Sequence, residues 1–139
     1  MMEERELIAL AKKAKENAYA PYSGFRVGAA LITKEGEIFS GCNVENVSFS
    51  LTNCAERTAV FSAVAAGYRD FVALAVTSDS EKFTFPCGAC RQVLIEFNPD
   101  MKIIMGNIND EYMIEKVSNL LPCFFHEESL GKPKGGKND

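Results

Sequence analysis

Two short segments of the chain carry thiols and a carboxylate at spacings that suit a metal centre. Cys54 is followed two residues later by Glu56, and Cys87 and Cys90 form a C-x-x-C step. Such a step directs two sulfurs toward one point, where a third thiolate from a neighbouring helix can meet them. Three thiolates fill three corners of a tetrahedron and leave the fourth for water, as in catalytic zinc sites.

Glu56 is placed to work beside that open corner. It lies two residues after Cys54, so its carboxylate can reach the fourth position without ligating the metal. Zinc lowers the pKa of its water to about 7, and a carboxylate can take that proton and hand it on. The two segments therefore predict hydrolytic chemistry with one Zn²⁺ per chain.

A C-x-x-C step alone has other interpretations. It can form a redox pair, or half of a zinc ribbon in which Cys42 or Cys123 completes four ligands. The C-x-E segment followed about thirty residues later by P-C-x-x-C is far more specific and favours the catalytic site. Cys42 and Cys123 are then expected to be packed thiols.

Helices and strands must position these segments, and their pattern alternates along the chain. Both thiol segments fall at predicted helix N-termini directly before buried strands, where free N–H groups and the helix dipole favour thiolate. Helices are predicted over residues 6–18, 54–66 and 87–97, with a final helical turn ending near 120–122. Strands are predicted over residues 25–31, 38–42, 71–77, 102–105 and 112–114.

The order α-β-β-α-β-α-β-β-α predicts an α/β fold. We expect a three-layer α/β/α sandwich with a central five-stranded mixed sheet, because strands that alternate with helices build one sheet covered on both faces. Residues 1–130 form a single predicted domain, and residues 131–139 have the composition of a flexible C-terminal tail. The Asn- and Ser-rich stretch over residues 41–53 is a long loop, and such loops tend to be functional.

Composition narrows the class of protein and its partners. The 139 residues are 47% hydrophobic and 24% charged, which suits one globular domain. The net charge of −4 disfavours nucleic acid and anionic membrane surfaces as partners. No apolar run approaches about 18 residues and the start, MMEERE, lacks a secretory pattern, so we expect a cytoplasmic protein. Five cysteines, an odd number, indicate thiols or metal ligands rather than disulfides.

The zinc motif lies within a longer resemblance. AYAPYSGFRVGAAL, GCNVENVSFS, NCAERTAVF, PCGACRQVL and the late LLPxxF resemble, in order, the small homotetrameric class of zinc-dependent cytidine deaminase. The resemblance covers about residues 7–130, and its zinc signature is the form led by cysteine rather than histidine. It implies a homotetramer and a small nucleoside as substrate.

The resemblance also implies roles for individual residues. Glu56 corresponds to the proton shuttle, and Arg57 to a donor to ligand sulfur. Phe49 stands where this class commonly has Tyr, so it is expected to shape the pocket without a hydroxyl contact. The zinc ligands correspond to Cys54, Cys87 and Cys90, and the substrate-binding residues to Asn43 and Glu45 (ribose hydroxyls), Phe25 (pyrimidine stacking), Ala55 (backbone to the base) and Phe125 (a neighbouring subunit's site).

Arg57 also has a physical reason to lie beside the sulfurs. Zn²⁺ with three thiolates carries a net charge of −1 and is a weaker Lewis acid. A guanidinium near the ligands withdraws charge and keeps the water acidic. A surface arginine on the first helical turn is the alternative.

The expected activity is hydrolytic deamination of cytidine and 2′-deoxycytidine to uridine and 2′-deoxyuridine, with release of ammonia, in pyrimidine salvage. A deaminase of a cytosine-containing antibiotic such as blasticidin S is the nearest alternative, and the ribose readers Asn43 and Glu45 argue against it. A polynucleotide deaminase is disfavoured by the charge. A structural zinc module is the alternative that is not an enzyme.

Overall fold

The computed structural model describes residues 2–131 and has one sheet between helices. The helices are α1 (Glu4–Lys15), α2 (Ala55–Ala65), α3 (Gly88–Phe97) and α4 (Val117–Leu120), with 3-10 turns at Phe49–Leu51 and Glu127–Leu130. The strands are β1 (Val27–Thr33), β2 (Ile38–Cys42), β3 (Phe71–Ser78), β4 (Lys102–Gly106) and β5 (Tyr112–Lys116).

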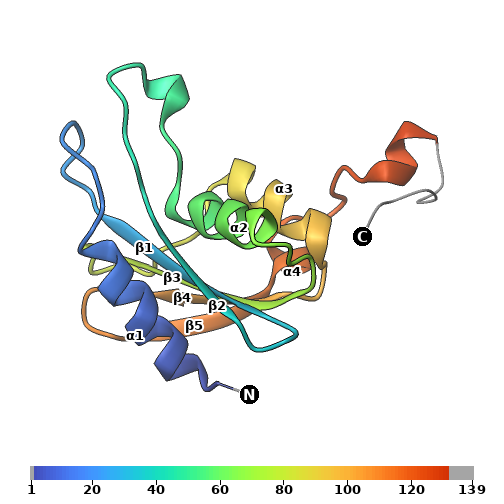
Figure 1. Cartoon of the computed structure of the whole chain (residues 1–139), viewed down its shortest axis with the longest axis horizontal. Helices are drawn as coiled ribbons and strands as arrows, with labels where there is room; N and C mark the ends of the chain where they lie inside the picture. The colour runs from blue at the N-terminus through green and yellow to red at the C-terminus, as the bar shows by residue number, and fades with distance from the viewer. Residues whose placement is uncertain (1, 132–139) are drawn as a thin grey trace.

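The five strands form a mixed sheet in the order β2-β1-β3-β4-β5. Only β3 and β4 are parallel, since α3 provides the crossover between them, and the other neighbours are antiparallel. Helix α1 covers one face of the sheet, and α2, α3 and α4 lie on the other (Figure 1). The predicted three-layer α/β/α sandwich with five strands is confirmed.

Each face of the sheet has its own apolar core, because β1, β3 and β4 are buried on both sides. The core under α1 includes Leu7, Ile8, Ala11, Ala30 and Ile104. The larger core under α2 and α3 includes Leu31, Ala59, Leu74, Val76, Leu94 and Ile103.

Two glycines let the helices approach the sheet closely. A Cβ atom at Gly28 would lie 2.0 Å from the carbonyl oxygen of Ala11 in α1. On the other face, a Cβ atom at Gly41 would lie 2.4 Å from the carbonyl oxygen of Ala55 and 2.5 Å from the nitrogen of Ala59 in α2. Since a real Cβ contact starts at about 3.4 Å, the missing side chain at Gly41 sets the depth at which the first turn of α2 sits.

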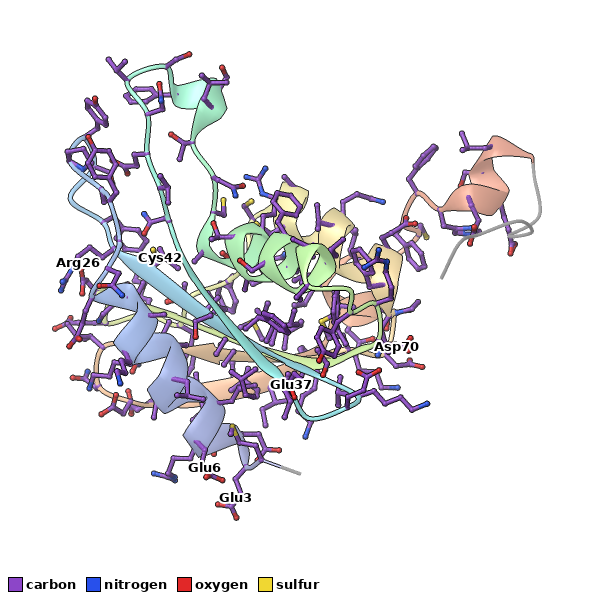
Figure 2. All side chains as sticks on the ribbon, in the orientation of Figure 1. Glu3, Glu6, Arg26, Glu37, Cys42 and Asp70 are labelled. Carbon is purple, nitrogen blue, oxygen red and sulfur yellow. The ribbon has the colours of Figure 1, made fainter. Side chains whose placement is uncertain are left out.

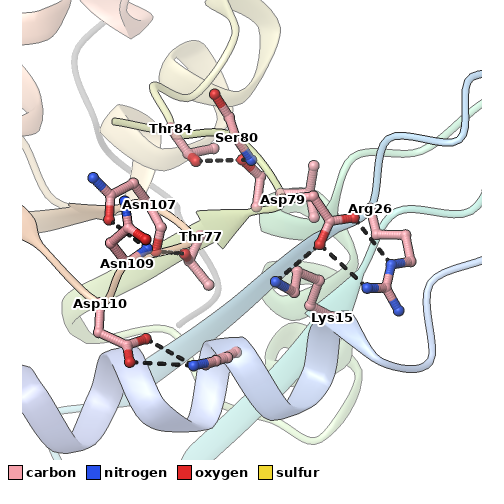
Figure 3. A network of polar contacts seen from close by, with 12 residues as sticks. Lys15, Arg26, Thr77, Asp79, Ser80, Thr84, Asn107, Asn109 and Asp110 are labelled. Atoms are coloured by element: carbon pink, nitrogen blue, oxygen red, sulfur yellow. Dashed lines mark hydrogen bonds and ion pairs between the residues drawn. The ribbon is translucent and has the colours of Figure 1, made fainter. Parts of the chain in front are cut away.

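An ion network joins α1 to the end of the sheet (Figure 3). Asp79, directly after β3, accepts from the buried Lys15 Nζ at 3.0 Å and from Arg26 Nε at 3.0 Å. Arg26 is the residue before β1, so one carboxylate fixes both α1 and the entrance to β1. The buried lysine is thereby paired, as a charge removed from water requires.

Some local expectations differ from the structure. The apolar composition of residues 54–66 would suggest Phe61 as a core residue, yet it is half exposed, because Ala59, Val60 and Ala63 form the inward face of α2. Cys123 is exposed rather than packed. The predicted tail over residues 131–139 lies outside the described residues except for Gly131. Within residues 2–131, no helix combines the length and apolar character needed to cross a membrane.

Candidate metal centre and active site

Three sulfur atoms converge where α2 and α3 begin. Cys54 is the N-cap residue of α2, Cys87 is the N-cap residue of α3, and Cys90 lies in the first turn of α3. Their Sγ atoms all lie within 4.8 Å of one another, and those of Cys54 and Cys87 are 3.8 Å apart. A tetrahedral zinc with Zn–S bonds of about 2.3 Å requires sulfurs about 3.8 Å apart, so the three thiols fit one zinc ion.

The surroundings of Cys54 favour its thiolate. The Cys90 thiol and then the Arg57 guanidinium donate hydrogen bonds to it and lower the pKa of Cys54 to about 5. The Arg57 Nη2 atom lies 3.2 Å from the Cys54 Sγ atom. The hydrogen bond between Cys90 and Cys54 raises the pKa of Cys90, because the Cys90 thiol is its donor. A metal ion that takes up all three thiolates replaces the proton in this cluster.

Glu56 lies in the first turn of α2 and is almost completely buried, with only 4% of its surface exposed. Burial raises the pKa of Glu56 to about 7, and the negative charge of Cys54 adds to the rise. A carboxyl group with such a pKa can accept a proton and return it near neutral pH.

Asn43 holds the backbone on both sides of Arg26, next to the predicted stacking residue Phe25. Its Oδ1 atom accepts from the Val27 N–H at 2.9 Å, and its Nδ2 atom donates to the Phe25 carbonyl at 2.8 Å. Asn43 is buried, whereas Phe25 is 44% exposed. These two bonds hold the backbone of Phe25 and Val27 and leave one Nδ2 hydrogen and one Oδ1 lone pair of Asn43 for a further partner.

Glu45 is held by the loop before β1. Its carboxylate accepts from the backbone N–H of Tyr22 at 3.0 Å, from that of Ser23 at 3.1 Å, and from the Ser23 hydroxyl. The Ser23 hydroxyl is the main cause that holds the pKa of Glu45 below its usual value. Together with Phe49 and Thr52, these residues line a surface hollow of about 330 Å³.

The aromatic side of this hollow comes from two loops. Phe49 is 73% exposed, and its ring meets that of Tyr22 edge to face, with centroids 6.1 Å apart. The loops leave the sheet where β1 begins and β2 ends, at the places that Arg26 and Cys42 mark in Figure 2. Phe49 therefore belongs to the same surface as Glu45.

Phe125 does not join these residues within one chain. Its segment, after α4, projects from the side of the molecule opposite the two loops (Figure 1). The Gln92 side chain in α3 donates to the Phe125 carbonyl at 2.7 Å, while 58% of Phe125 stays exposed. Ala55, in contrast, is fully buried in the first turn of α2, where its N–H has no partner within the helix.

Comparisons with known proteins agree with this metal centre. A family model described as the cytidine and deoxycytidylate deaminase zinc-binding region matches residues 1–107. The chain belongs to this deaminase family. A cytidine deaminase of Sporosarcina psychrophila is 52% identical over 130 residues, which cover 93% of this chain and 96% of that protein. A solved cytidine deaminase structure from Burkholderia pseudomallei is 51% identical, with a TM-score of 0.87, and the match covers 89% of this chain and all of that one.

A more distant relative bears on the antibiotic alternative. A blasticidin-S deaminase of Bacillus cereus is 34% identical over 104 residues, which cover 69% of this chain and 74% of that protein. Deaminases named for cytidine and for blasticidin S thus both occur among this chain's relatives. Membership of the family confirms the predicted zinc cofactor and the enzyme class, since the thiols that the motif requires are the ones brought together here.

Several residues around the site were missed by sequence reasoning. Gly41 was not singled out, although it stands directly before Cys42 and the Asn43 segment. Sequence spacing also assigns no role to Ser23 or Arg91, although Ser23 lies two residues before Phe25 and Arg91 directly follows Cys90. Their contacts join segments far apart in sequence, so spacing alone could not identify them.

Proposed function

We propose that this chain catalyses the zinc-dependent hydrolytic deamination of cytidine and 2′-deoxycytidine, giving uridine, 2′-deoxyuridine and ammonia. The observation that carries the proposal is the buried Glu56 carboxyl, with its pKa near 7, in the first turn of α2 only two residues after Cys54 of the three-thiol site. A structural zinc module fills all four positions with ligands and needs no carboxyl group of raised pKa beside the metal.

Glu56 moves the protons of the reaction. Cys54, Cys87 and Cys90 would hold the zinc, which would supply a Lewis acid that makes water acidic near neutral pH. The Glu56 carboxylate accepts a proton from the attacking water and delivers it to ring N3, while the water oxygen bonds to C4. Glu56 then transfers the second proton of the water to the amine, the C4–N bond breaks, and ammonia leaves with the carbonyl formed.

Arg57 and the thiolates tune this chemistry. The guanidinium donates to the Cys54 sulfur, withdraws electron density from it, and so offsets the net negative charge of three thiolates around a divalent ion. The buried position of Glu56 keeps competing water away from the carboxyl.

The two loops bind the nucleoside in this proposal. Phe25 stacks on the pyrimidine, Asn43 and Glu45 bind ribose hydroxyls, and the Ala55 backbone meets the base. Phe49 packs against the sugar side without a hydroxyl contact. The hollow beside Glu45 supports this assignment, since it combines a carboxylate with aromatic walls. Asn43 is buried, and a buried polar group left without a partner costs about 1–3 kcal/mol, so the site should discriminate against ligands that lack a ribose.

The test is the loss of cytidine absorbance with purified zinc-loaded enzyme. Wild type should convert cytidine and stop when a strong chelator removes the metal, whereas blasticidin S and a single-stranded oligonucleotide should remain unchanged. Glu56→Gln should keep zinc and nucleoside binding and lose about two to four orders of magnitude in turnover. Turnover within tenfold of wild type in that variant would mean that another group moves the protons.

We also propose a homotetramer in which Phe125 completes a neighbouring site. The segment after α4, which includes Phe125, and the nucleoside loops lie on opposite sides of one chain (Figure 1), so a second copy is needed to bring them together. In a mixture of Glu56→Gln and Phe125→Ala chains, some sites combine an intact Glu56 with an intact Phe125 from the other chain. Reassembled hybrids should therefore regain activity, and hybrids no more active than Phe125→Ala alone would place Phe125 outside the neighbouring site.

A cytoplasmic location and a role in pyrimidine salvage complete the proposal. Three metal-binding thiols and two further free cysteines suit a reducing compartment, where thiols do not pair as disulfides. The products are uridines, which a salvage reaction would supply for reuse.

A further inference from the structure

Cys87 is the most exposed of the three metal ligands and depends on its neighbours for its position. Cys90 is fully buried within α3, and Cys54 receives a hydrogen bond from Arg57. Cys87, in contrast, ends the irregular stretch between β3 and α3, and its side chain makes no cap bond to the helix. An exposed ligand at the end of a loop loses its geometry unless the backbone beside it is fixed.

Arg91 fixes that backbone on both sides of Cys87. Its backbone N–H donates to the Cys87 carbonyl at 3.0 Å, and its Nε atom donates to the Pro86 carbonyl at 2.8 Å. Pro86 has no N–H, so its carbonyl is the one backbone group through which a hydrogen bond can hold it. The Pro86 and Cys87 carbonyls, one on each side of the Cys87 α-carbon, are thus bound to the same residue.

The other end of the guanidinium is anchored in a different element. The Arg91 Nη1 atom donates to the carbonyl of Leu120, the last residue of α4, at 2.7 Å. This carbonyl is one of the orphan acceptors at the end of a helix, so Arg91 satisfies it. A planar guanidinium can bridge two carbonyls in fixed directions, whereas an ammonium cannot replace that geometry.

We infer that Arg91 is a positioning residue for the metal ligand Cys87, and that its bridge between Pro86 and Leu120 sets how tightly the site retains zinc. Arg91 does not contact the sulfur atoms in the way that Arg57 does, so it acts through the backbone of Cys87. The inference rests on the metal centre and not on the identity of the substrate.

The test measures zinc retention in Arg91→Lys and Arg91→Met. Arg69→Met is the matched control, since the Arg69 Nη1 atom bridges the carbonyls of Val64 and Tyr68, both at 3.0 Å, at the opposite end of α2. Zinc release to an excess of a chromophoric chelator is followed on folded holoenzyme, and affinity is measured by chelator competition. Co²⁺-substituted protein reports the ligand geometry through its visible and sulfur charge-transfer bands.

Both Arg91 variants should bind zinc about 10- to 100-fold more weakly than wild type and show altered Co²⁺ bands. Arg69→Met should lower the unfolding temperature and leave zinc affinity unchanged. Wild-type affinity in Arg91→Lys would overturn the inference, since charge alone would then suffice, and so would an equal loss in Arg69→Met. If Arg91→Met does not fold, the milder Arg91→Lys decides the matter. Wild-type protein that binds no zinc would instead refute the proposed function.

Discussion

A methyl group at Gly41 tests how closely α2 must approach the sheet. In Gly41→Ala the new Cβ atom would lie 2.4 Å from the Ala55 carbonyl oxygen, whereas ordinary contact begins at 3.4 Å. The new Cβ atom is bonded to the backbone of β2, and the Ala55 oxygen is part of the backbone of α2, so no flexible side chain can move aside to relieve the contact. The first turn of α2, which carries Cys54 and Glu56, must therefore retreat by about 1 Å.

A displacement of about 1 Å at the reacting groups costs on the order of 100-fold in rate. The same overpacking should cost about 1–3 kcal/mol in the free energy of unfolding. We expect Gly41→Ala to lower kcat/KM for cytidine by about that factor, measured by absorbance and expressed per zinc-loaded, folded molecule.

Gly28→Ala provides the control on the opposite face of the sheet. Its Cβ atom would meet the Ala11 carbonyl oxygen at 2.0 Å, which is an even closer approach, but α1 carries no metal ligand. Gly28→Ala should lose at least as much stability as Gly41→Ala and keep kcat/KM within a few-fold of wild type. Equal kcat/KM values for the two variants would refute the argument that the depth of α2 controls the site.

Three further outcomes follow from the structure. By elemental analysis, Cys87→Ala should contain little zinc and Cys42→Ala should keep one ion per chain, because Cys87 belongs to the three-sulfur cluster and Cys42 does not. Full zinc occupancy in Cys87→Ala would contradict the ligand assignment. Glu45→Ala should lower kcat/KM for cytidine by about 10-fold or more without loss of zinc, since a hydrogen-bond acceptor for the ribose hydroxyls is removed, and unchanged kinetics would exclude Glu45 as a ribose reader. Hydrogen bonds from Arg26 and then Lys15 hold the pKa of Asp79 below its usual value. The ionised Asp79 therefore stabilises the folded state fully above the unfolded pKa of about 4, and this stabilisation is lost as the pH falls from there through the lower folded pKa. Asp79→Asn should therefore lower the free energy of unfolding by about 3 kcal/mol at pH 7, because Lys15 is left unpaired. Measured by chemical unfolding at a series of pH values, the variant should also lose less stability than wild type at acidic pH. An unchanged loss of stability at acidic pH would show that Asp79 is not its source.

Sequence spacing was sufficient for the features that depend on short stretches of chain. The alternation of helices and strands, and the helix starts at Cys54 and Cys87, follow from local apolar periodicity and from where a helix can begin. The placement of Glu56 beside the metal site follows from two residues of one helical turn. These properties need no knowledge of which segments meet in space, and the C-x-E and P-C-x-x-C motifs already contained them.

Only the folded chain shows which distant segments meet. The contact of Gly41 with α2, the bridge from Arg91 to Leu120, and the bonds from Asn43 to the Phe25 backbone all join residues far apart in sequence. The segment after α4, which includes Phe125, projects from the side of the molecule opposite the loops before β1 and after β2 (Figure 1). Such relations depend on strand order and on helix depth against the sheet, and these result from packing the whole core rather than from the spacing of residues within any one motif.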